Sequence, residues 1–168
     1  MARQFYASAQ ASLVGSPQDL VGVQARAGAF ARVLKAFISC ADQSLPQPCQ
    51  LSLAMVFLPA SVTPGTGGTS TLPQPVDQGD APPQSYSWQH STGLAISSNP
   101  APVPQIIPLG CHIYQGLEIT FAEPLPMLNG QAWVFRLLQA PASPANLVAW
   151  LLIEEFGYFP PRPTWTPA

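Results

Sequence analysis

Charged side chains are scarce in this sequence, and Lys35 is the only lysine. Only 8% of the 168 residues are charged, against about 25% in an average soluble protein. The six basic residues are scattered and form no stripe that could follow a phosphate backbone, which argues against nucleic acid as a partner. A formal net charge of −2 on so few groups protects weakly against association. We therefore expect partner molecules to cover much of the surface, as in an assembly component.

Long apolar runs are also missing. No stretch approaches the roughly 18 consecutive apolar residues of a membrane span, so we expect no transmembrane helix and no membrane partner. The segment Met1–Gln10 lacks the continuous apolar core of a signal peptide. These two absences lead us to expect a protein that is made and kept in a cytoplasm until assembly.

Cysteine is rare, and its spacing does not indicate a zinc site. The three cysteines, Cys40, Cys49 and Cys111, include no C-x-x-C pair. Cys40 and Cys49 flank a predicted loop, and a disulfide could close that loop if their Cα atoms lie within about 7 Å. The alternative is that all three are reduced and act as small buried apolar residues, which the lack of an export signal favours.

Recognisable catalytic signatures are absent as well. The only histidines are His90 and His112, neither lies in a known motif, and there is no G-x-S-x-G. Glu118 and Glu123 could form a carboxylate pair for glycoside cleavage, and Glu118 with the two histidines could hold a metal in a cupin-like barrel. However, His112 and Glu118 share the polar side of one predicted strand, where a solvated face or a subunit contact explains them. The sequence therefore predicts no enzyme, no cofactor and no metal site.

Alternating apolar and polar residues predict β-strands throughout the chain, and the clearest unit is Gly110–Glu155. In its first strand the apolar residues all lie on the same side, as in a half-buried strand: Cys111, Ile113, Leu117, Ile119 and Phe121. Pro124 and Pro126 are expected to end this strand, and Asn129-Gly130 provides a turn, since both residues tolerate positive φ. Further strands are predicted at Ala132–Leu138 and at Leu147–Ile153, which is almost wholly apolar and suits a strand covered on both faces.

Upstream strands and long connections favour a jelly roll. Strands are predicted at Phe30–Cys40, Leu51–Leu58 and Ser85–Ser97, and 21 prolines and 12 glycines separate the apolar runs. The connection Pro59–Gln84 is too long for a hairpin, and such loops are usually functional or mobile. We predict an all-β, antiparallel two-sheet sandwich, specifically a jelly roll of about eight strands with extended termini.

The expected organisation is one domain with two terminal segments. Residues 20–156 form the β-sandwich, residues 1–19 form an arm or an edge strand, and residues 157–168 form a proline-rich arm. Four prolines hold this last segment extended. Our hypothesis is that it lies on a neighbouring subunit, with Trp165 as anchor and Arg162 as polar contact, and with Tyr158 and Phe159 also at the contact. The alternative is a disordered or self-packed tail.

The order of features from Leu20 to Phe156 resembles the small jelly-roll virion proteins of tailed bacteriophages, namely capsid decoration (cement) or accessory structural proteins. The resemblance is carried by four segments: Ala31-Arg32-Val33-Leu34, Leu51–Leu58 leading into Thr63–Thr71, Pro126–Gln131, and Ile153-Glu154-Glu155. It implies a non-enzymatic role in the virion shell after synthesis in the host cytoplasm. Such proteins are commonly trimers on capsomers, so the implied partners are further copies of this chain and the major capsid protein. The proline-rich tail and the three cysteines depart from the pattern.

An alternative from another functional class is a carbohydrate- or receptor-binding jelly-roll module of a phage fibre, or of a tail or neck component. Such modules often expose a flat aromatic platform, which Tyr86 and Trp88 could provide. The two functions differ in what they require of Trp88. A glycan-binding module keeps this side chain exposed in the free protein, whereas a shell protein buries its aromatic residues at subunit contacts.

Overall fold

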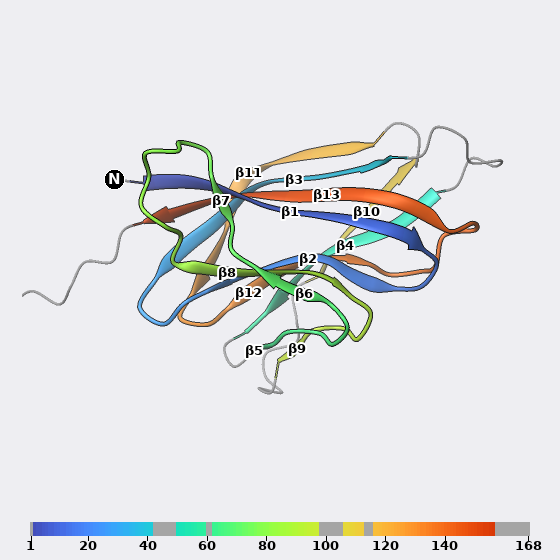
Figure 1. Ribbon diagram of the computed structural model, residues 1–168, viewed down its shortest axis with the longest axis horizontal. Helices are drawn as coiled ribbons and strands as arrows, with labels where there is room; N and C mark the ends of the chain where they lie inside the picture. Colours follow the sequence, from blue (N-terminus) through green and yellow to red (C-terminus); the bar gives the residue numbers. More distant parts are fainter. Residues whose placement is uncertain (1, 42–49, 60–61, 98–105, 113–115, 157–168) are drawn as a thin grey trace, which may run out of the picture.

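The computed structural model describes residues 2–41, 50–59, 62–97, 106–112 and 116–156, and all its elements are β-strands (Figure 1). A five-stranded sheet contains, in spatial order, β11 (Leu117–Leu128), β3 (Phe30–Cys40), β13 (Ala145–Phe156), β1 (Ala2–Val14) and β7 (Gln74–Pro75). A six-stranded sheet contains β10 (Ile106–His112), β4 (Gln50–Leu58), β12 (Ala132–Leu137), β2 (Gln18–Ala25), β8 (Ser85–Ser91) and β6 (Thr69–Thr71). A separate pair consists of β5 (Val62–Thr63) and β9 (Ile96–Ser97). The predicted antiparallel two-sheet sandwich is confirmed.

The long strands pair in the pattern of a jelly roll. The first, β1, pairs with the last, β13, and moving inward along the chain β2 pairs with β12, β3 with β11, and β4 with β10. Outside residues 62–97, the chain crosses between the sheets after β1, β2, β3, β10, β11 and β12. The fold is therefore one long antiparallel hairpin rolled into a sandwich. The strands β5–β9 lie between β4 and β10, and we call their segment, residues 62–97, the insertion.

The main core fills the space between the two sheets. On β13, which lies between β3 and β1, alternate residues such as Leu147, Leu151 and Ile153 point inward and are buried. The largest side chains from other strands include Phe5 and Phe135, both fully buried. Residues 2–14, which the sequence left open between an arm and an edge strand, thus belong to the sandwich as β1.

The turn at Asn129-Gly130 is found as predicted. Asn129 has φ 39° and Gly130 has φ 83°, so both adopt the left-handed conformation of a tight turn, through which the chain passes from β11 in one sheet to β12 in the other. The Gln131 amide donates to the Leu128 carbonyl at 2.8 Å. The Asn129 Oδ1 atom accepts a bond of 2.7 Å from the Gly28 amide, so this turn also ties down the β2–β3 connection.

The first predicted strand of the Gly110–Glu155 unit is wrong in two respects. Its two halves belong to different sheets, because β10 ends at His112, β11 begins at Leu117, and Gly116 (φ 65°) lies where the chain enters β11. The prolines at 124 and 126 do not end β11, which continues to residue 128. β11 is an edge strand of the five-stranded sheet. A proline in such a strand can turn its nitrogen, which carries no proton, to the unpaired side and so cost no hydrogen bond between strands.

The predicted loop Pro59–Gln84 has regular structure of its own. Within the insertion, β6 pairs with β8, β7 pairs with β1, and β5 pairs with β9. The strand predicted at Ser85–Ser97 is found as β8 and β9, separated by a short connection. The insertion therefore extends both sheets at the side where β1 and β2 lie.

Two buried carboxylates hold the insertion against the sandwich. Glu155, 1% exposed, accepts bonds of 2.8 Å from the backbone amides of Gln84 and Ser85, just where β8 begins. Asp19 is fully buried, pairs with Arg136, and accepts a bond of 2.7 Å from the Ala95 amide beyond the end of β8. The Arg136 guanidinium also donates to the Ala95 carbonyl at 2.9 Å. Each end of β8 is thus fixed by a charge-assisted contact.

Several sequence-based expectations fall outside the described residues. The proposed bond between Cys40 and Cys49 cannot be placed because Cys49 lies in one of the gaps, whereas Cys40 is half-buried and Cys111 is buried. The same holds for the proline-rich segment 157–168. The described residues form strands only, so they include no helix that could span a membrane.

Candidate functional site

The outer faces of the two sheets differ in what covers them. The insertion packs on the outer face of the six-stranded sheet and forms a second small core there, made of Ala54, Val56, Leu58, Val62, Trp88, Ala95, Ala132 and Val134. The indole of Trp88 lies on Gly22, where a Cβ atom would collide with the ring. Glycine at this position is therefore required for the second core to close.

The outer face of the five-stranded sheet instead carries aromatic side chains that keep part of their surface in solvent. Trp150 on β13 lies between Phe37 on β3 and Tyr6 on β1. The rings of Phe37 and Trp150 stack with centroids 5.1 Å apart and planes 14° from parallel. Tyr6, 39% exposed, meets Trp150 edge-on at 5.3 Å and 87°. We call these three residues, with Phe30 and Phe156 at the end of the same sheet, the aromatic face.

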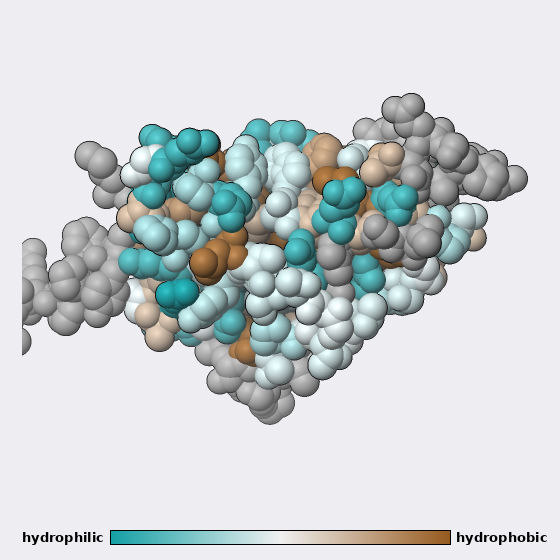
Figure 2. Space-filling view, viewed as in Figure 1, coloured by the Kyte–Doolittle hydropathy of each residue, from teal (hydrophilic) through white to brown (hydrophobic). Residues whose placement is uncertain are grey.

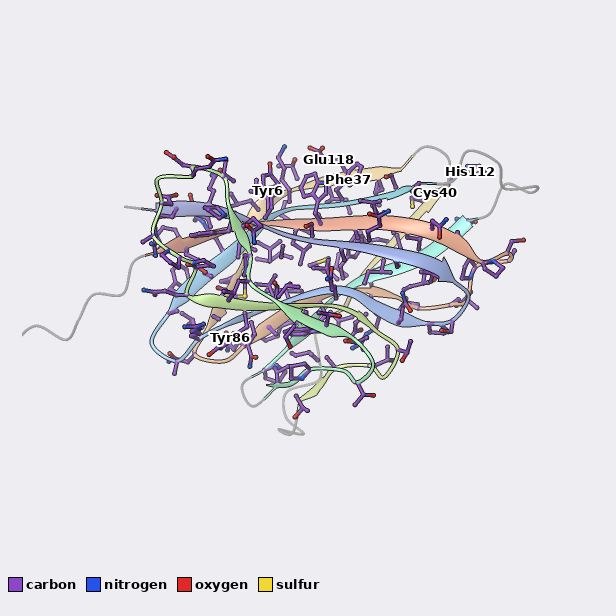
Figure 3. The ribbon with its side chains drawn as sticks, in the orientation of Figure 1. Tyr6, Phe37, Cys40, Tyr86, His112 and Glu118 are labelled. Carbon is purple, nitrogen blue, oxygen red and sulfur yellow. The ribbon has the colours of Figure 1, made fainter. Side chains whose placement is uncertain are left out.

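The charged residues of this face are neutralised within the sheet. Lys35 pairs with Glu118 at 2.9 Å, and Arg32 pairs with Glu154 through two nitrogen atoms at 2.7 and 2.6 Å. The Arg32 guanidinium also lies 4.9 Å from the centroid of the Phe156 ring. Tyr6, Phe37 and Glu118 are seen on the same side of the sandwich in Figure 3. The charges of Lys35, Glu118, Arg32 and Glu154 on the aromatic face thus compensate one another in pairs.

An open depression of about 400 Å³ adjoins the aromatic face where Tyr6 meets the insertion. It lies between β1 and the strands β6–β8, and its polar lining is uncharged: Ser8, Gln10, Thr71, Gln74 and Gln89. Apolar atoms come from Tyr6, Ala9, Leu72 and Val148. Figure 2 shows this side of the molecule as a mixed surface, with small apolar patches among hydrophilic residues.

The aromatic platform predicted from Tyr86 and Trp88 is not present. Tyr86 is 48% exposed, with the Arg26 guanidinium 4.1 Å from its ring centroid, but Trp88 is only 2% exposed. The two side chains point to the same side of β8, yet other parts of the insertion, with Val62 and Ala95, pack on Trp88. Tyr86 lies at the sheet end, far from Tyr6 and Phe37 (Figure 3). The other residues predicted at a contact, Tyr158, Phe159, Arg162 and Trp165, lie outside the described residues.

The structure does not bring together the residues of the catalytic alternatives. His112 and His90 lie on β10 and β8, which are separated by β4, β12 and β2 in the six-stranded sheet, whereas Glu118 lies on the other sheet. Glu118 is bonded to Lys35, and Glu123 is exposed. Among the described residues, no group of three His, Cys, Asp or Glu side chains is placed to hold a metal ion.

Comparison with known proteins identifies no relative. No family model matches the chain, and neither the curated proteins nor the solved structures give a significant match. Function is therefore inferred from the geometry of the molecule itself.

Proposed function

We propose that the protein is a non-enzymatic structural subunit that assembles with further copies of itself through the aromatic face. The observation that carries this proposal is the position of Trp150, held between Phe37 and Tyr6 on an outer sheet face. Aromatic side chains are enriched at protein interfaces, where large rings bury apolar area at low entropic cost. The outer face of the other sheet needs no partner of this kind, because the insertion already covers it.

The ring geometry favours a protein partner over a sugar. Because Phe37 and Trp150 stand on directly opposed positions of neighbouring strands and stack on one another, their facing surfaces are already used. The second neighbour of Trp150, Tyr6, meets it edge-on. A sugar ring would need an open aromatic face to stack on, whereas a protein side chain can pack against ring edges. The burial of Trp88 removes the other platform that a carbohydrate-binding module would use.

The charge pattern supports a second copy of the chain as the occupant. The pairs Lys35–Glu118 and Arg32–Glu154 neutralise the face locally, so an identical face can approach without net repulsion. The same scarcity of charge extends to the whole chain, of which only 8% is charged. Apolar burial between copies would then be the main source of association free energy.

The resemblance to decoration proteins of tailed bacteriophages supports a more specific form of the proposal. In this form the protein is a homotrimer that decorates or cements a capsid, contacts the major capsid protein, and resides in the virion after synthesis in the host cytoplasm. The jelly-roll topology is the fold that this resemblance implies. A receptor-binding fibre module or a tail or neck component would share the sandwich and differ in its partners.

The test is the mass of the protein in solution, measured by light scattering at low and high salt, with and without reductant. We expect a stable oligomer, near three times 17.9 kDa for a trimer, that is insensitive to both. Trp150→Gln should dissociate it, whereas Tyr86→Gln, which changes an exposed aromatic residue away from the aromatic face, should not. Circular dichroism checks that both variants fold. A monomeric parent protein, or a Trp150→Gln variant that stays assembled, contradicts the proposal.

A further inference from the structure

The edge of β1 is only partly paired. The two-residue strand β7 pairs with β1 at Phe5 and Tyr6, and no described strand pairs beyond that point. The Val76 amide donates to the Gln4 carbonyl at 2.9 Å, so the backbone groups of Gln4 face this edge. Because backbone groups alternate along a strand, those of Ser8 and Gln10 face the same edge. These two residues have no ladder partner there among the residues that the structure describes.

The depression described above follows this unpaired edge. Ser8, Ala9 and Gln10 form one wall, and Thr71 and Gln89 lie opposite. Between Ser8 and Gln10 lies Ala9, whose side chain points between the two sheets and is too small to fill the depression. The site therefore offers backbone donors and acceptors beside an open depression of about 400 Å³. This combination suits an added β-strand that carries one large side chain.

The proline-rich segment beyond the described residues contains a matching pattern, Pro163-Thr164-Trp165-Thr166-Pro167. In an extended strand, Thr164 and Thr166 turn their backbone groups to one side. The backbone groups of Pro163, Trp165 and Pro167 point to the other side. On an edge strand that side is unpaired, so the missing amide protons of the two prolines cost no hydrogen bond. Threonine and tryptophan are also favoured in strands. This segment is thus suited to form hydrogen bonds with another strand along one side only, the side of Thr164 and Thr166.

We propose that Pro163–Pro167 of a neighbouring copy adds to β1 as an antiparallel strand. Thr166 lies opposite Ser8 and Thr164 lies opposite Gln10, so that each pair exchanges backbone hydrogen bonds. This inference rests on the proposed self-assembly and names a second contact through which it takes place.

In this register Trp165 lies opposite Ala9. Side chains of opposed residues point to the same face of a sheet, so the indole enters the depression beside Ala9, toward Thr71 and Gln89. A large aromatic side chain in a small concave site is the usual form of a binding hot spot. The lining is uncharged, which matches a segment whose five residues carry no charge.

Chain length favours a neighbouring copy over the same copy as the donor. Phe156 pairs with Ala2, and the eight residues from there to Thr164 span at most about 29 Å when fully extended. Gln10 lies about 27 Å along β1 from Ala2, and the free edge lies about 10 Å across the sheet from β13. The same copy would need a completely straight chain and would then have to reverse direction. A parallel addition would meet β7, which already occupies the edge at Phe5 and Tyr6.

The test exchanges threonine and proline at neighbouring positions of the full chain. The double variant Thr164→Pro, Thr166→Pro removes the two amides that face β1, whereas Pro163→Thr, Pro167→Thr adds amides that face away. Oligomer mass is measured by light scattering, and exchange of the Ser8 and Gln10 amides with deuterium is followed by NMR. We expect the first variant to lower the oligomer mass and to speed exchange of both amides about tenfold or more. The second variant should match the parent protein.

Each other outcome overturns the inference. Faster exchange at Ser8 and Gln10 with unchanged mass would mean that the segment adds to its own copy. Unchanged exchange in the first variant would mean that the segment does not occupy this edge, and protection of the edge only after a neutral oligosaccharide is added would identify a sugar site. If Trp150→Gln dissociates the oligomer while both proline variants leave it intact, the proposed function stands and the strand addition fails.

Discussion

Phe37 and Trp150 face one another across β3 and β13, with ring centroids 5.1 Å apart on an outer face of the sandwich. A buried core pair would be explained by burial alone, but these rings keep part of their surface in solvent. Their stacking fixes both side chains before any partner arrives. A preformed contact of this kind lowers the entropic cost of association, because fewer side chains must be ordered on binding.

The stacked pair should also contribute to the stability of the single chain. We expect Trp150→Ala to lower the free energy of unfolding by about 2 kcal/mol, less than for a fully buried tryptophan because the ring keeps part of its surface in solvent. A double-mutant cycle with Phe37→Ala should give a coupling of about 0.5 to 1.5 kcal/mol. Urea denaturation under dissociating conditions measures both quantities. Additive effects of the two changes would show that the rings do not interact.

Glu155 should be required for docking of the insertion. Glu155→Gln removes the negative charge and replaces one of the two acceptor oxygens by an NH2 group, so the Gln84 and Ser85 amides would have to share a single oxygen. We expect a loss of about 1 to 3 kcal/mol in the free energy of unfolding, and faster proteolytic cleavage within the insertion. Glu118→Gln is the control, because that side chain is 49% exposed and its ion pair should contribute under about 1 kcal/mol. Equal stability of the two variants would contradict the docking role.

Removing the charge of Asp19 alone should lower the free energy of unfolding more than removing the charges of both Asp19 and Arg136. Asp19→Asn leaves the largely buried Arg136 guanidinium without its counter-charge, and we expect a loss of about 3 to 5 kcal/mol. Replacing both residues, as Asp19→Asn with Arg136→Met, should cost less than the single change because no charge stays buried. Thermal and urea unfolding of the two variants tests this order. A double variant less stable than Asp19→Asn would show that the arginine contributes through its bond to Ala95 instead.

Adding even a single methyl group at Gly22 should destabilise the fold. Gly22→Ala would force the Trp88 ring away from the sheet, and we expect it to lower the free energy of unfolding by about 1 to 3 kcal/mol. Gly110→Ala is the matched control, since an added Cβ there meets its nearest atom, Gln50 Nε2, at 3.7 Å. Denaturant midpoints measure the difference. Similar midpoints for the two variants would mean that the second core can move to make room.

Local patterns in the sequence predicted the fold class and several elements. The alternation in β4, the apolar run in β13 and the turn chemistry of Asn129-Gly130 are all properties of short segments, and each was found. The long strand β1 was left open because Ala7, Ala9 and Ala11 supply its buried side, and alanine is a weak signal for a strand. Pairing with β13 makes this segment a strand, and that pairing is not visible locally.

The candidate site depends on contacts that no single segment reveals. Tyr6, Phe37 and Trp150 come from three strands, and only their register brings the rings together. The register between β13 and β3 shifts between Leu152 and Ile153. The alternation of inward and outward side chains along β3 therefore changes at that point. The burial of Trp88 was not predicted, because the residues that pack on it come partly from an insertion with few apolar residues. Coverage by such a segment can be recognised only in three dimensions.

The pairing of β1 with β13 also has a consequence for how the chain folds as it is synthesised. Ala2 meets Phe156, so the second strand from the edge of the five-stranded sheet cannot find its long partner until nearly the whole described chain has left the ribosome. Loops closed over such separations form slowly, and the topology predicts slow folding. Until then the apolar side of β1, with Phe5, stays exposed in a chain that has few charges to keep it apart from others. The interval before β13 arrives is the period in which this protein is most open to misassociation.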